Sequence, residues 1–186
     1  MGEIMGSDDI KVSRFISLIL RHKPDEIGIK LDRYGWANVD ELIAGLNRKG
    51  YAINRLDLDR IVGEDDKNRY SYSIDSTKIR ANQGHSIDVD LQMKEVIPPQ
   101  ILYHGTGEKY LASICEGGIV KKDRQYVHLS SSYETAVSVG SRHGKAIVME
   151  VDTEQMYLDG CVFYRSENGV YLTEYVARGY IKVIIG

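Results

Sequence analysis

Apolar side chains recur at helical spacing in three places within residues 1–97. The first run predicts a helix from Asp9 to Arg21, because apolar residues recur every three to four positions until Pro24 ends the run. Two further helices are expected after Asn38 and after Asn54, since asparagine before an apolar run is typical of a helix N-cap. The predicted inward positions of the three helices are Val12, Phe15, Ile16, Ile19, Leu42, Ile43, Leu46, Leu58, Ile61 and Val62.

After the third helix the hydrophobic period changes to two. Tyr70, Tyr72 and Ile74 alternate with serines, a turn follows, and Ile79 begins a return strand, which predicts a β-hairpin. Three helices followed by a hairpin is the element order of a winged helix. This topology is common among nucleic-acid binders, but a fold alone does not establish a function.

The second half of the chain is expected to be a small α+β domain around a mostly antiparallel sheet. Pro98 and Pro99 mark the junction, because neither residue can donate a backbone hydrogen bond, and the predicted domains are therefore residues 1–97 and 98–186. The predicted strands are Ile101–Tyr103, Tyr126–Leu129, Ala146–Val151, Cys161–Tyr164, Val170–Thr173 and Ile181–Ile185, with helices near Lys109–Cys115 and Tyr133–Val139.

Composition narrows the function classes. The chain has 24 Lys and Arg against 27 Asp and Glu, a net charge of −3, so a polyanionic partner would have to meet a local cluster of arginines. No apolar run approaches the ~20 residues that span a bilayer, and residues 1–9 lack the features of a secretory leader. Cys115 and Cys161 lie far apart and form no CxxC pair, which argues against a disulfide framework or zinc ribbon. We expect a cytoplasmic protein without a membrane partner.

Five histidines lie at the edges of predicted elements, beside Gly, Ser, Thr or basic residues. They are His22, His85, His104, His128 and His143. None has the i,i+4 spacing that places two metal ligands on one helix face, so no metal site is expected. Each histidine alone could equally be a structural or surface residue.

The segment His104-Gly105-Thr106-Gly107 is expected to carry a strand into a glycine-rich turn and then a helix. Free backbone N–H groups at such a turn suit a phosphate. The alternative is a tight turn that needs glycine only for backbone freedom.

Arg21, Arg69 and Arg124 lie beside these motifs rather than within helical charge stripes. Guanidinium groups bind phosphate bidentately, so three converging arginines would form an anion site in a nearly neutral protein. Alternatively, Arg21 complements the C-terminus of its helix and the other two are solvated. Spacing along the chain does not distinguish these possibilities.

Taken together, these motifs resemble those of the RNA 2′-phosphotransferases, NAD-dependent enzymes that remove an internal 2′-phosphate from spliced tRNA. The resemblance extends from Val12 to Val183. It is carried by Ser13–Phe15, Leu20–Pro24, Asp32–Val39, Lys67–Tyr70, Ile79–Ser86, Tyr103–Thr106, Arg124–Ser130 and Val139–Lys145. The chain departs from the family pattern at Ala177, where a proline is usual, and at Tyr70, where many relatives have phenylalanine.

The resemblance implies an N-terminal winged-helix lobe that binds RNA and a C-terminal lobe like the ADP-ribosyltransferases that binds NAD. The implied catalytic residues are Arg21, His22, Arg69 and Arg124, with Arg142 as the alternative fourth member. The implied NAD-binding residues are His104, Gly105, Thr106, His128, Leu129, Ser130 and Arg142. The implied RNA-binding residues are Lys23, Gln83, His85 and Ser86.

The implied reaction transfers the 2′-phosphate to NAD as co-substrate and yields 2′-OH RNA, nicotinamide and ADP-ribose 1″,2″-cyclic phosphate, with no metal. We expect a monomer in which the arginines and His22 meet in a cleft between the lobes, and a structural or solvated Glu174. Two alternatives stay open: an ADP-ribosyltransferase that caps terminal nucleic-acid phosphates, and a non-catalytic winged-helix sensor of NAD or ADP-ribose.

Overall fold

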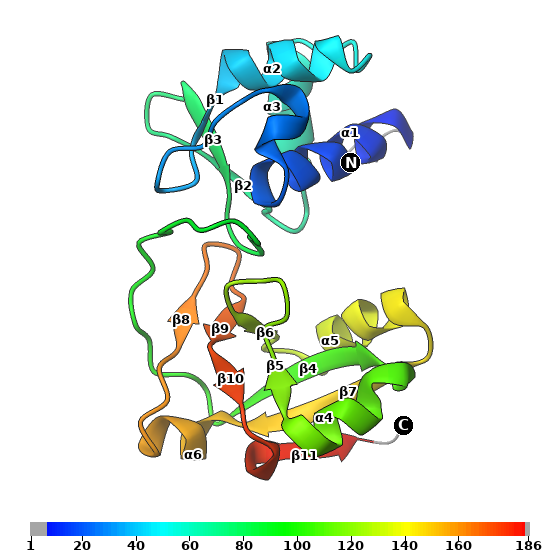
Figure 1. The fold of residues 1–186 in the computed structure, drawn as a ribbon, viewed down its shortest axis with the longest axis vertical. Helices are drawn as coiled ribbons and strands as arrows, with labels where there is room; N and C mark the ends of the chain where they lie inside the picture. The colour runs from blue at the N-terminus through cyan, green and yellow to red at the C-terminus, as the bar shows by residue number, and fades with distance from the viewer. Residues whose placement is uncertain (1–6, 185–186) are drawn as a thin grey trace. The chain divides into compact units, whose positions relative to one another are not determined.

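The computed structural model describes residues 7–184, and these residues fold as two compact units. Unit 1 is Met1–Gln92 and unit 2 is Met93–Gly186, so the division lies N-terminal to the Pro98-Pro99 pair. Part of the segment tested for a secretory leader, residues 1–6, lies outside the described residues, as does Ile185 of the last predicted strand. The elements of each unit are labelled in Figure 1.

The described part of unit 1 contains the three helices and the hairpin that the sequence predicts. Its elements are α1 (Ser7–Arg21), η1 (Pro24–Ile27), β1 (Ala37–Asn38), α2 (Val39–Arg48), α3 (Arg55–Gly63), β2 (Tyr70–Tyr72) and β3 (Lys78–Ala81). The strands form an antiparallel sheet in the order β1-β3-β2. Strand β1, which pairs Ala37 with Ile79, was not predicted, because two residues are too short for a periodic signal.

Both predicted N-caps are confirmed. The Asn38 side chain accepts a hydrogen bond from the backbone N–H of Glu41 at 3.0 Å. Asn54 accepts from the N–H of Asp57, whose carboxylate accepts in return from the N–H of Asn54, a complete capping box. These contacts are local in sequence, which is why the sequence predicts them.

The apolar stripes of the helices form the core of unit 1. Ile16, Leu42 and Leu58 are fully buried there with the strand residue Ile79. Ile74 is an exception, because it lies beyond the end of β2 in the hairpin turn and is fully exposed. The predicted period-two run therefore extends one step beyond the strand itself, which ends at Tyr72.

Unit 2 has mixed α and β structure, as predicted. Its elements are β4 (Ile101–Gly107), η2 (Glu108–Tyr110), α4 (Leu111–Gly117), β5 (Ile119–Val120), β6 (Val127–Leu129), α5 (Tyr133–Gly140), η3 (Ser141–His143), β7 (Ala146–Asp152), α6 (Thr153–Leu158), β8 (Tyr164–Arg165), β9 (Tyr171–Thr173), β10 (Tyr175–Val176), η4 (Arg178–Tyr180) and β11 (Ile181–Ile184). All described strand pairs are antiparallel, in the sheets β11-β7-β4, β6-β9-β8 and β10-β5.

Two predictions for unit 2 need correction. Strand β4 does not end at Tyr103 but continues to Gly107, and Gly105 pairs with Val148 on β7. The segment Cys161–Phe163 is not a strand, and β8 begins only at Tyr164. Phe163 is 1% exposed within the unit 2 core, so its apolar side chain reflects burial rather than strand pairing, and its neighbour Val162 is exposed.

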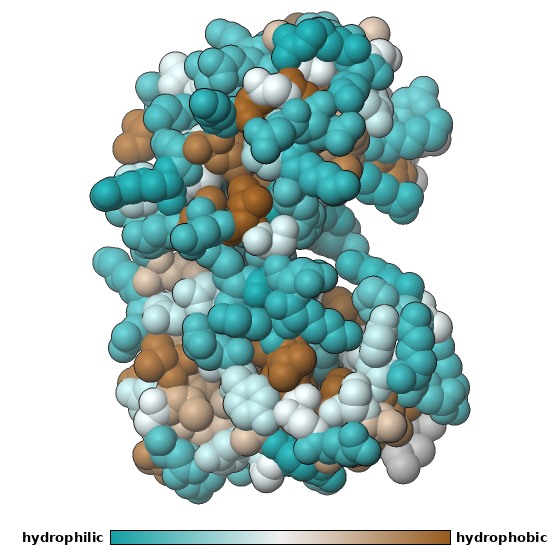
Figure 2. Space-filling view, viewed as in Figure 1, coloured by the Kyte–Doolittle hydropathy of each residue, from teal (hydrophilic) through white to brown (hydrophobic). Residues whose placement is uncertain are grey.

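The visible surface is mostly hydrophilic, with separate small apolar patches (Figure 2). Exposed large apolar side chains such as Leu56, Ile97 and Leu158 contribute to the apolar surface of the chain. Within residues 7–184, no helix has the length and apolar character needed to cross a membrane.

Candidate active site

The C-terminal end of α1 presents Arg21 and His22. The chain turns there, and the backbone N–H of His22 donates to the carbonyl of Leu18 at 2.9 Å. The loop that follows β3 packs on this end of α1, because the N–H of Ser86 donates to the carbonyl of Arg21 at 3.0 Å. The Ser86 hydroxyl also lies 2.9 Å from Nδ1 of His22. The His22 ring is therefore held at Nδ1 by the loop that follows β3.

Arg69 is held by a buried carboxylate. Asp65, whose side chain is 1% exposed, forms an ion pair with Nη1 of Arg69. The same carboxylate accepts from the backbone N–H of Arg69 at 2.5 Å. Two bonds from one carboxylate fix both the backbone and the guanidinium, and the remaining N–H groups of Arg69 stay available to an anion.

The phenol of Tyr70 connects these two regions. Its hydroxyl donates to the carbonyl of Ser13 at 2.5 Å and lies 2.6 Å from the hydroxyl of Ser17, both on α1. Burial raises the pKa of Tyr70, while those hydrogen bonds and the positive charges of Arg21 and Arg69 act to lower it. Both guanidiniums are thus close enough to act on one phenol, so unit 1 brings Arg21, His22 and Arg69 into one region.

His85 lies beneath this region. It is 1% exposed, and neither ring nitrogen has a hydrogen-bond partner within residues 7–184. Burial, together with the smaller effects of the positive charges of Arg21, His22 and Arg80, lowers the pKa of His85 to about 4. Because the imidazole of His85 is neutral, it adds no further positive charge next to Arg21, His22 and Arg80. Its predicted contact with RNA would require the loop to open, whereas Ser86 and Lys23 are exposed.

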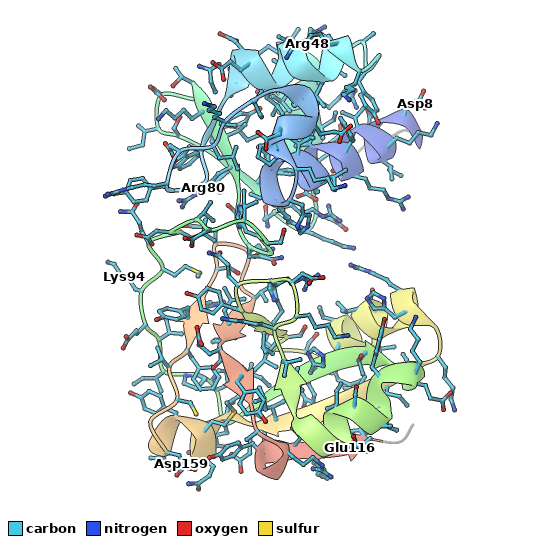
Figure 3. All side chains as sticks on the ribbon, in the orientation of Figure 1. Asp8, Arg48, Arg80, Lys94, Glu116 and Asp159 are labelled. Carbon is cyan, nitrogen blue, oxygen red and sulfur yellow. The ribbon has the colours of Figure 1, made fainter. Side chains whose placement is uncertain are left out.

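Arg80 is a cation that the sequence-based site prediction missed. It lies on β3 (labelled in Figure 3), and its guanidinium stacks 4.5 Å from the ring centroid of Trp36. The only sequence signal was its place in the segment Ile79–Ser86. Asp65 was missed too, because an acidic residue in a turn gives no sign that it is buried.

In unit 2, His104 and His128 lie on neighbouring strands. A bridge between Tyr103 and Ser130 joins β4 to β6, and Nδ1 of His104 donates to the carbonyl of His128 at 3.1 Å. Burial lowers the pKa of His104, the hydrogen bond to His128 raises it, and the charges of Arg124 and Lys122 lower it. The hydrogen bond fixes the tautomer of His104, so its Nε2 is not protonated when the ring is neutral.

Two glycines of strand β4, Gly105 and Gly107, have a packing role. A side chain on Gly105 would overlap the carbonyl oxygen of Ala136 in α5, and one on Gly107 would meet the backbone of His143. Neither glycine has the positive φ of a tight turn. The predicted glycine-rich turn is therefore wrong, and these residues let α5 and η3 approach strand β4 closely.

Arg124 and Arg142 lie near one another in unit 2. Burial of its guanidinium lowers the pKa of Arg124, and the like charge of Arg142 lowers it further. Lys122 adds a third cation, with its ammonium 3.8 Å from the ring centroid of Tyr110. Because Arg124 belongs to unit 2, its meeting with Arg21, His22 and Arg69 stays a prediction.

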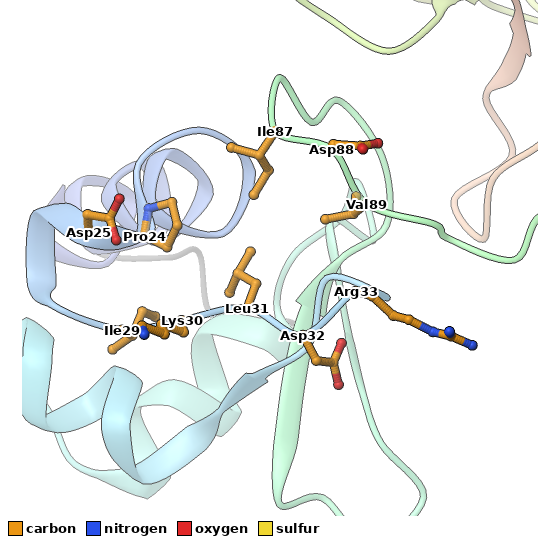
Figure 4. Close-up of a pocket in the computed structure, with 10 residues that line it drawn as sticks. All are labelled: Pro24, Asp25, Ile29, Lys30, Leu31, Asp32, Arg33, Ile87, Asp88 and Val89. Carbon is orange, nitrogen blue, oxygen red and sulfur yellow. The ribbon is translucent and has the colours of Figure 1, made fainter.

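A shallow groove of about 290 Å³ lies in unit 1, lined by η1 and by the segments 29–33 and 87–89. Figure 4 shows Leu31 and Ile87 pointing toward one another across it, while Asp32 and Arg33 point away. Its lining carries acidic as well as basic and apolar side chains, so it differs in chemistry from the cationic surroundings of Arg21.

Metal ligands do not gather in the described part of the chain, where no group of three or more His, Cys, Asp or Glu side chains could hold an ion. Cys115 and Cys161 are both free thiols. Glu174 is largely exposed and its carboxylate lies 3.5 Å from the ammonium of Lys121.

Comparison with known proteins connects this geometry to a family. The family model described as RNA 2'-phosphotransferase, Tpt1 / KptA family, matches residues 7–175. A protein of Fusobacterium nucleatum is 55% identical over 176 residues, which are 94% of this chain and 98% of that protein. A protein of Flavobacterium johnsoniae is 51% identical, over 92% of this chain and 94% of its own length. One of Trichormus variabilis is 47% identical, over 94% and 96%. All three are named "Probable RNA 2'-phosphotransferase". The chain belongs to the RNA 2′-phosphotransferase family, a family of transferase enzymes.

Proposed function

We propose that this protein transfers an internal RNA 2′-phosphate to NAD and releases 2′-OH RNA, nicotinamide and ADP-ribose 1″,2″-cyclic phosphate. The observation that carries the proposal is that Arg21 and Arg69 both lie close enough to act on the phenol of Tyr70 in unit 1, with His22 next to Arg21 and held by Ser86. Two guanidiniums and an imidazole suit a phosphate dianion, because charged N–H donors bind phosphate oxygens bidentately. The RNA would be a tRNA that carries a 2′-phosphate after splicing, or another RNA under repair.

In this proposal unit 1 acts as a winged-helix lobe that binds RNA. Its helices and the β2-β3 hairpin follow the order of that fold. Lys23 and Gln83 would contact the RNA near the phosphate, while Ser86 and the buried His85 would support this surface from within the same loop. Unit 2 acts as the ADP-ribosyltransferase-like lobe that binds NAD. The protein would work as a cytoplasmic monomer, and its free thiols fit a reducing compartment.

The residues of unit 2 fit a dinucleotide that carries two phosphates. His104 and His128 lie side by side on β4 and β6, next to Thr106 and the strand residues Leu129 and Ser130. The cations that act on them supply charge for a pyrophosphate, because Lys122 and Arg124 lie near His104 and Arg142 lies near Arg124. Gly105 and Gly107 would contribute by close packing rather than by free N–H groups.

In the first step, an oxygen of the RNA 2′-phosphate attacks C1″ of the nicotinamide ribose, and the bond to nicotinamide breaks. The nucleophile is already an anion near pH 7, so the step needs no strong base. Glu174, exposed and close to Lys121, has no part in it. The arginines hold the anion in place for the attack.

In the second step, the ribose 2″-hydroxyl attacks phosphorus and the bond to the RNA 2′-oxygen breaks. The hydroxyl proton is lost, and the leaving oxygen gains one to become the RNA 2′-hydroxyl. Negative charge builds on the phosphoryl oxygens, where Arg21, Arg69 and Arg124 would stabilise it. His22, held by Ser86 at Nδ1, would act through Nε2 as donor or proton carrier.

Product analysis tests the proposal. The protein is incubated with NAD and a short oligonucleotide that carries one internal 2′-phosphate, and both products are identified by mass. We expect 2′-OH RNA and the cyclic phosphate of ADP-ribose in equal amounts. A stable ADP-ribosylated terminal phosphate would favour the capping activity instead. Binding of NAD without release of nicotinamide would favour the non-catalytic sensor.

A further inference from the structure

The loop 82–86 of unit 1 contacts Arg69 at one end and Arg21 with His22 at the other. At its first residue, the backbone N–H of Asn82 donates to the carbonyl of Arg69 at 2.8 Å. The side-chain amide of Asn82 donates to the carbonyl of Asn68 at 2.7 Å, and its oxygen accepts from the hydroxyl of Ser71 at 2.7 Å. Asn82 is 4% exposed, so these bonds are shielded from water.

The turn that Asn82 holds is a strained one. Asn68 has φ of +42°, a left-handed conformation that costs energy for a residue with a side chain. Its carbonyl is the acceptor for Asn82, and its N–H donates to the carbonyl of Asp65 at 2.9 Å. Arg69 follows directly, so the direction of its side chain depends on this turn.

The other end of the loop holds the end of α1. Ser86 binds twice, through its N–H to the carbonyl of Arg21 and through its hydroxyl to Nδ1 of His22. Between the two ends, Gly84 lies against the Arg21 side chain, where an added Cβ would be 3.7 Å from its guanidinium nitrogen. One short segment therefore spans from the turn of Arg69 to Arg21 and His22.

We propose that Asn82 and Ser86 are positioning residues, which fix Arg69 and His22 relative to one another so that both act on the same phosphate. The inference rests on the proposed function, because it gives a role to the loop only if these groups meet the RNA 2′-phosphate. Neither residue needs to touch the substrate. Ser86, expected above to bind RNA, would act through His22.

Displacements of about 1 Å at a reacting centre can slow a reaction by about a hundredfold, so the effect of losing these bonds is measurable. Ser86→Ala removes the hydroxyl that holds Nδ1 of His22, and Asn82→Ala removes the bond that holds the strained turn. We expect the second step to slow about tenfold or more in both variants. ADP-ribosylated RNA should then accumulate, while the KM for NAD stays unchanged.

The experiment measures both steps in a single turnover with 2′-phosphorylated RNA and NAD. The readout is the ratio of the second rate constant to the first, because this ratio does not depend on the fraction of protein that is folded. Ser86→Thr keeps the hydroxyl and should restore the ratio. Asn82→Asp keeps the acceptor for Ser71 but loses the donor to Asn68, and should lower the ratio. If Asn82→Ala does not fold, Asn82→Asp takes its place.

Two control variants match these changes in unit 1. Asn47→Ala removes an asparagine that joins two segments through bonds to Ile53, and Ser73→Ala removes a hydroxyl in the hairpin turn. Both should leave the ratio unchanged even if they lower the melting temperature.

The outcomes separate this inference from the proposed function. An unchanged ratio in Ser86→Ala or in the Asn82 variants, with a lowered ratio in Arg69→Ala, overturns the positioning role of that residue alone. An unchanged ratio in Arg69→Ala as well overturns the proposed function and this inference with it.

A second measurement is the nitrogen chemical shift of His22 Nδ1, which should change in Ser86→Ala and return in Ser86→Thr.

Discussion

The two units hold their cationic groups in different ways. In unit 1, Arg69 is bound to Asp65 and His22 to Ser86, so both side chains have fixed positions before any ligand arrives. In unit 2, Arg124 and Arg142 lie near each other, and neither guanidinium forms a hydrogen bond within the described residues. The first arrangement is preorganised, and the second contains a repulsion that an anion would relieve. We therefore expect changes in unit 1 to alter rates and changes in unit 2 to alter affinity.

The variant with the largest expected effect changes Gly105 of unit 2, and it tests whether this glycine is needed for packing or for ligand binding. Gly105→Ala should destabilise unit 2 by more than about 3 kcal/mol or prevent its folding, because the backbone of α5 cannot move away from β4 without repacking. Chemical denaturation of the whole protein measures this. Gly117→Ala is the matched control, since an added Cβ there meets nothing within 4 Å. A Gly105→Ala protein of normal stability that fails to bind NAD would contradict the packing role.

The next effect concerns the fixed guanidinium of unit 1. Arg69→Ala should slow the second step about a hundredfold, roughly 3 kcal/mol, and allow ADP-ribosylated RNA to accumulate. Single-turnover assays measure it. Arg69→Lys keeps a cation beside the buried Asp65 but loses the planar fork, so it should fold normally and still react slowly. Unchanged turnover in both variants would remove Arg69 from the mechanism.

A third prediction concerns the pH dependence of stability in unit 1. The pKa of His85 falls from 6.5 to about 4 on folding, so between these values the unfolded chain binds a proton that the folded chain does not. Stability contributed by neutral His85 is thus present above pH 6.5 and lost as pH falls toward 4. The loss is on the order of 2 kcal/mol between pH 7 and pH 5.

His85→Gln provides the comparison, because glutamine does not titrate. Denaturation curves at pH 7 and pH 5 should show a smaller difference in the variant than in the original protein. An equal pH dependence in both would mean that folding does not shift the pKa of His85. Other groups that titrate in this range contribute equally to both proteins and cancel in the comparison.

The smallest effect belongs to the unpaired arginines of unit 2. Arg124→Ala should lower kcat/KM for NAD about tenfold, the order expected for losing one hydrogen bond to a charged group. It should slow the second step less than Arg69→Ala does, because no carboxylate holds the Arg124 guanidinium in place as Asp65 holds that of Arg69. It should leave the melting temperature unchanged or raise it slightly, because the repulsion from Arg142 disappears. Steady-state kinetics at two salt concentrations check this. If Arg142→Ala has the greater effect, Arg142 takes the place of Arg124 in the site.

Predictions from the sequence succeeded where the determining contacts are local. Asn38 and Asn54 cap their helices through residues two or three positions away, and the pattern of apolar residues gives the helix faces directly. The grouping of Arg21 and His22 with Ser86 was expected only through the family resemblance. Its physical basis, two bonds between residues more than sixty positions apart, has no signature in the spacing of residues.

Residue patterns predict the wrong structure where one residue type serves two purposes. Gly105 and Gly107 are as typical of a phosphate-binding turn as of a strand packed closely under a helix, and only the position of Ala136 decides between them. Asp65 has the same ambiguity, because a carboxylate in an acidic turn is usually solvated. Its burial depends on how the turn folds against the rest of unit 1.

The loop 82–86 also limits how the length of the chain can change. Strand β3 ends at Ala81 and the loop must reach the end of α1 within a few residues, so one inserted residue would move Ser86 away from His22 and push His85 toward solvent. The hairpin tip at Ile74 carries no such constraint, because it is exposed. A peptide tag or spectroscopic label is therefore best inserted at that tip, which leaves the spacing from Ala81 to Ser86 intact.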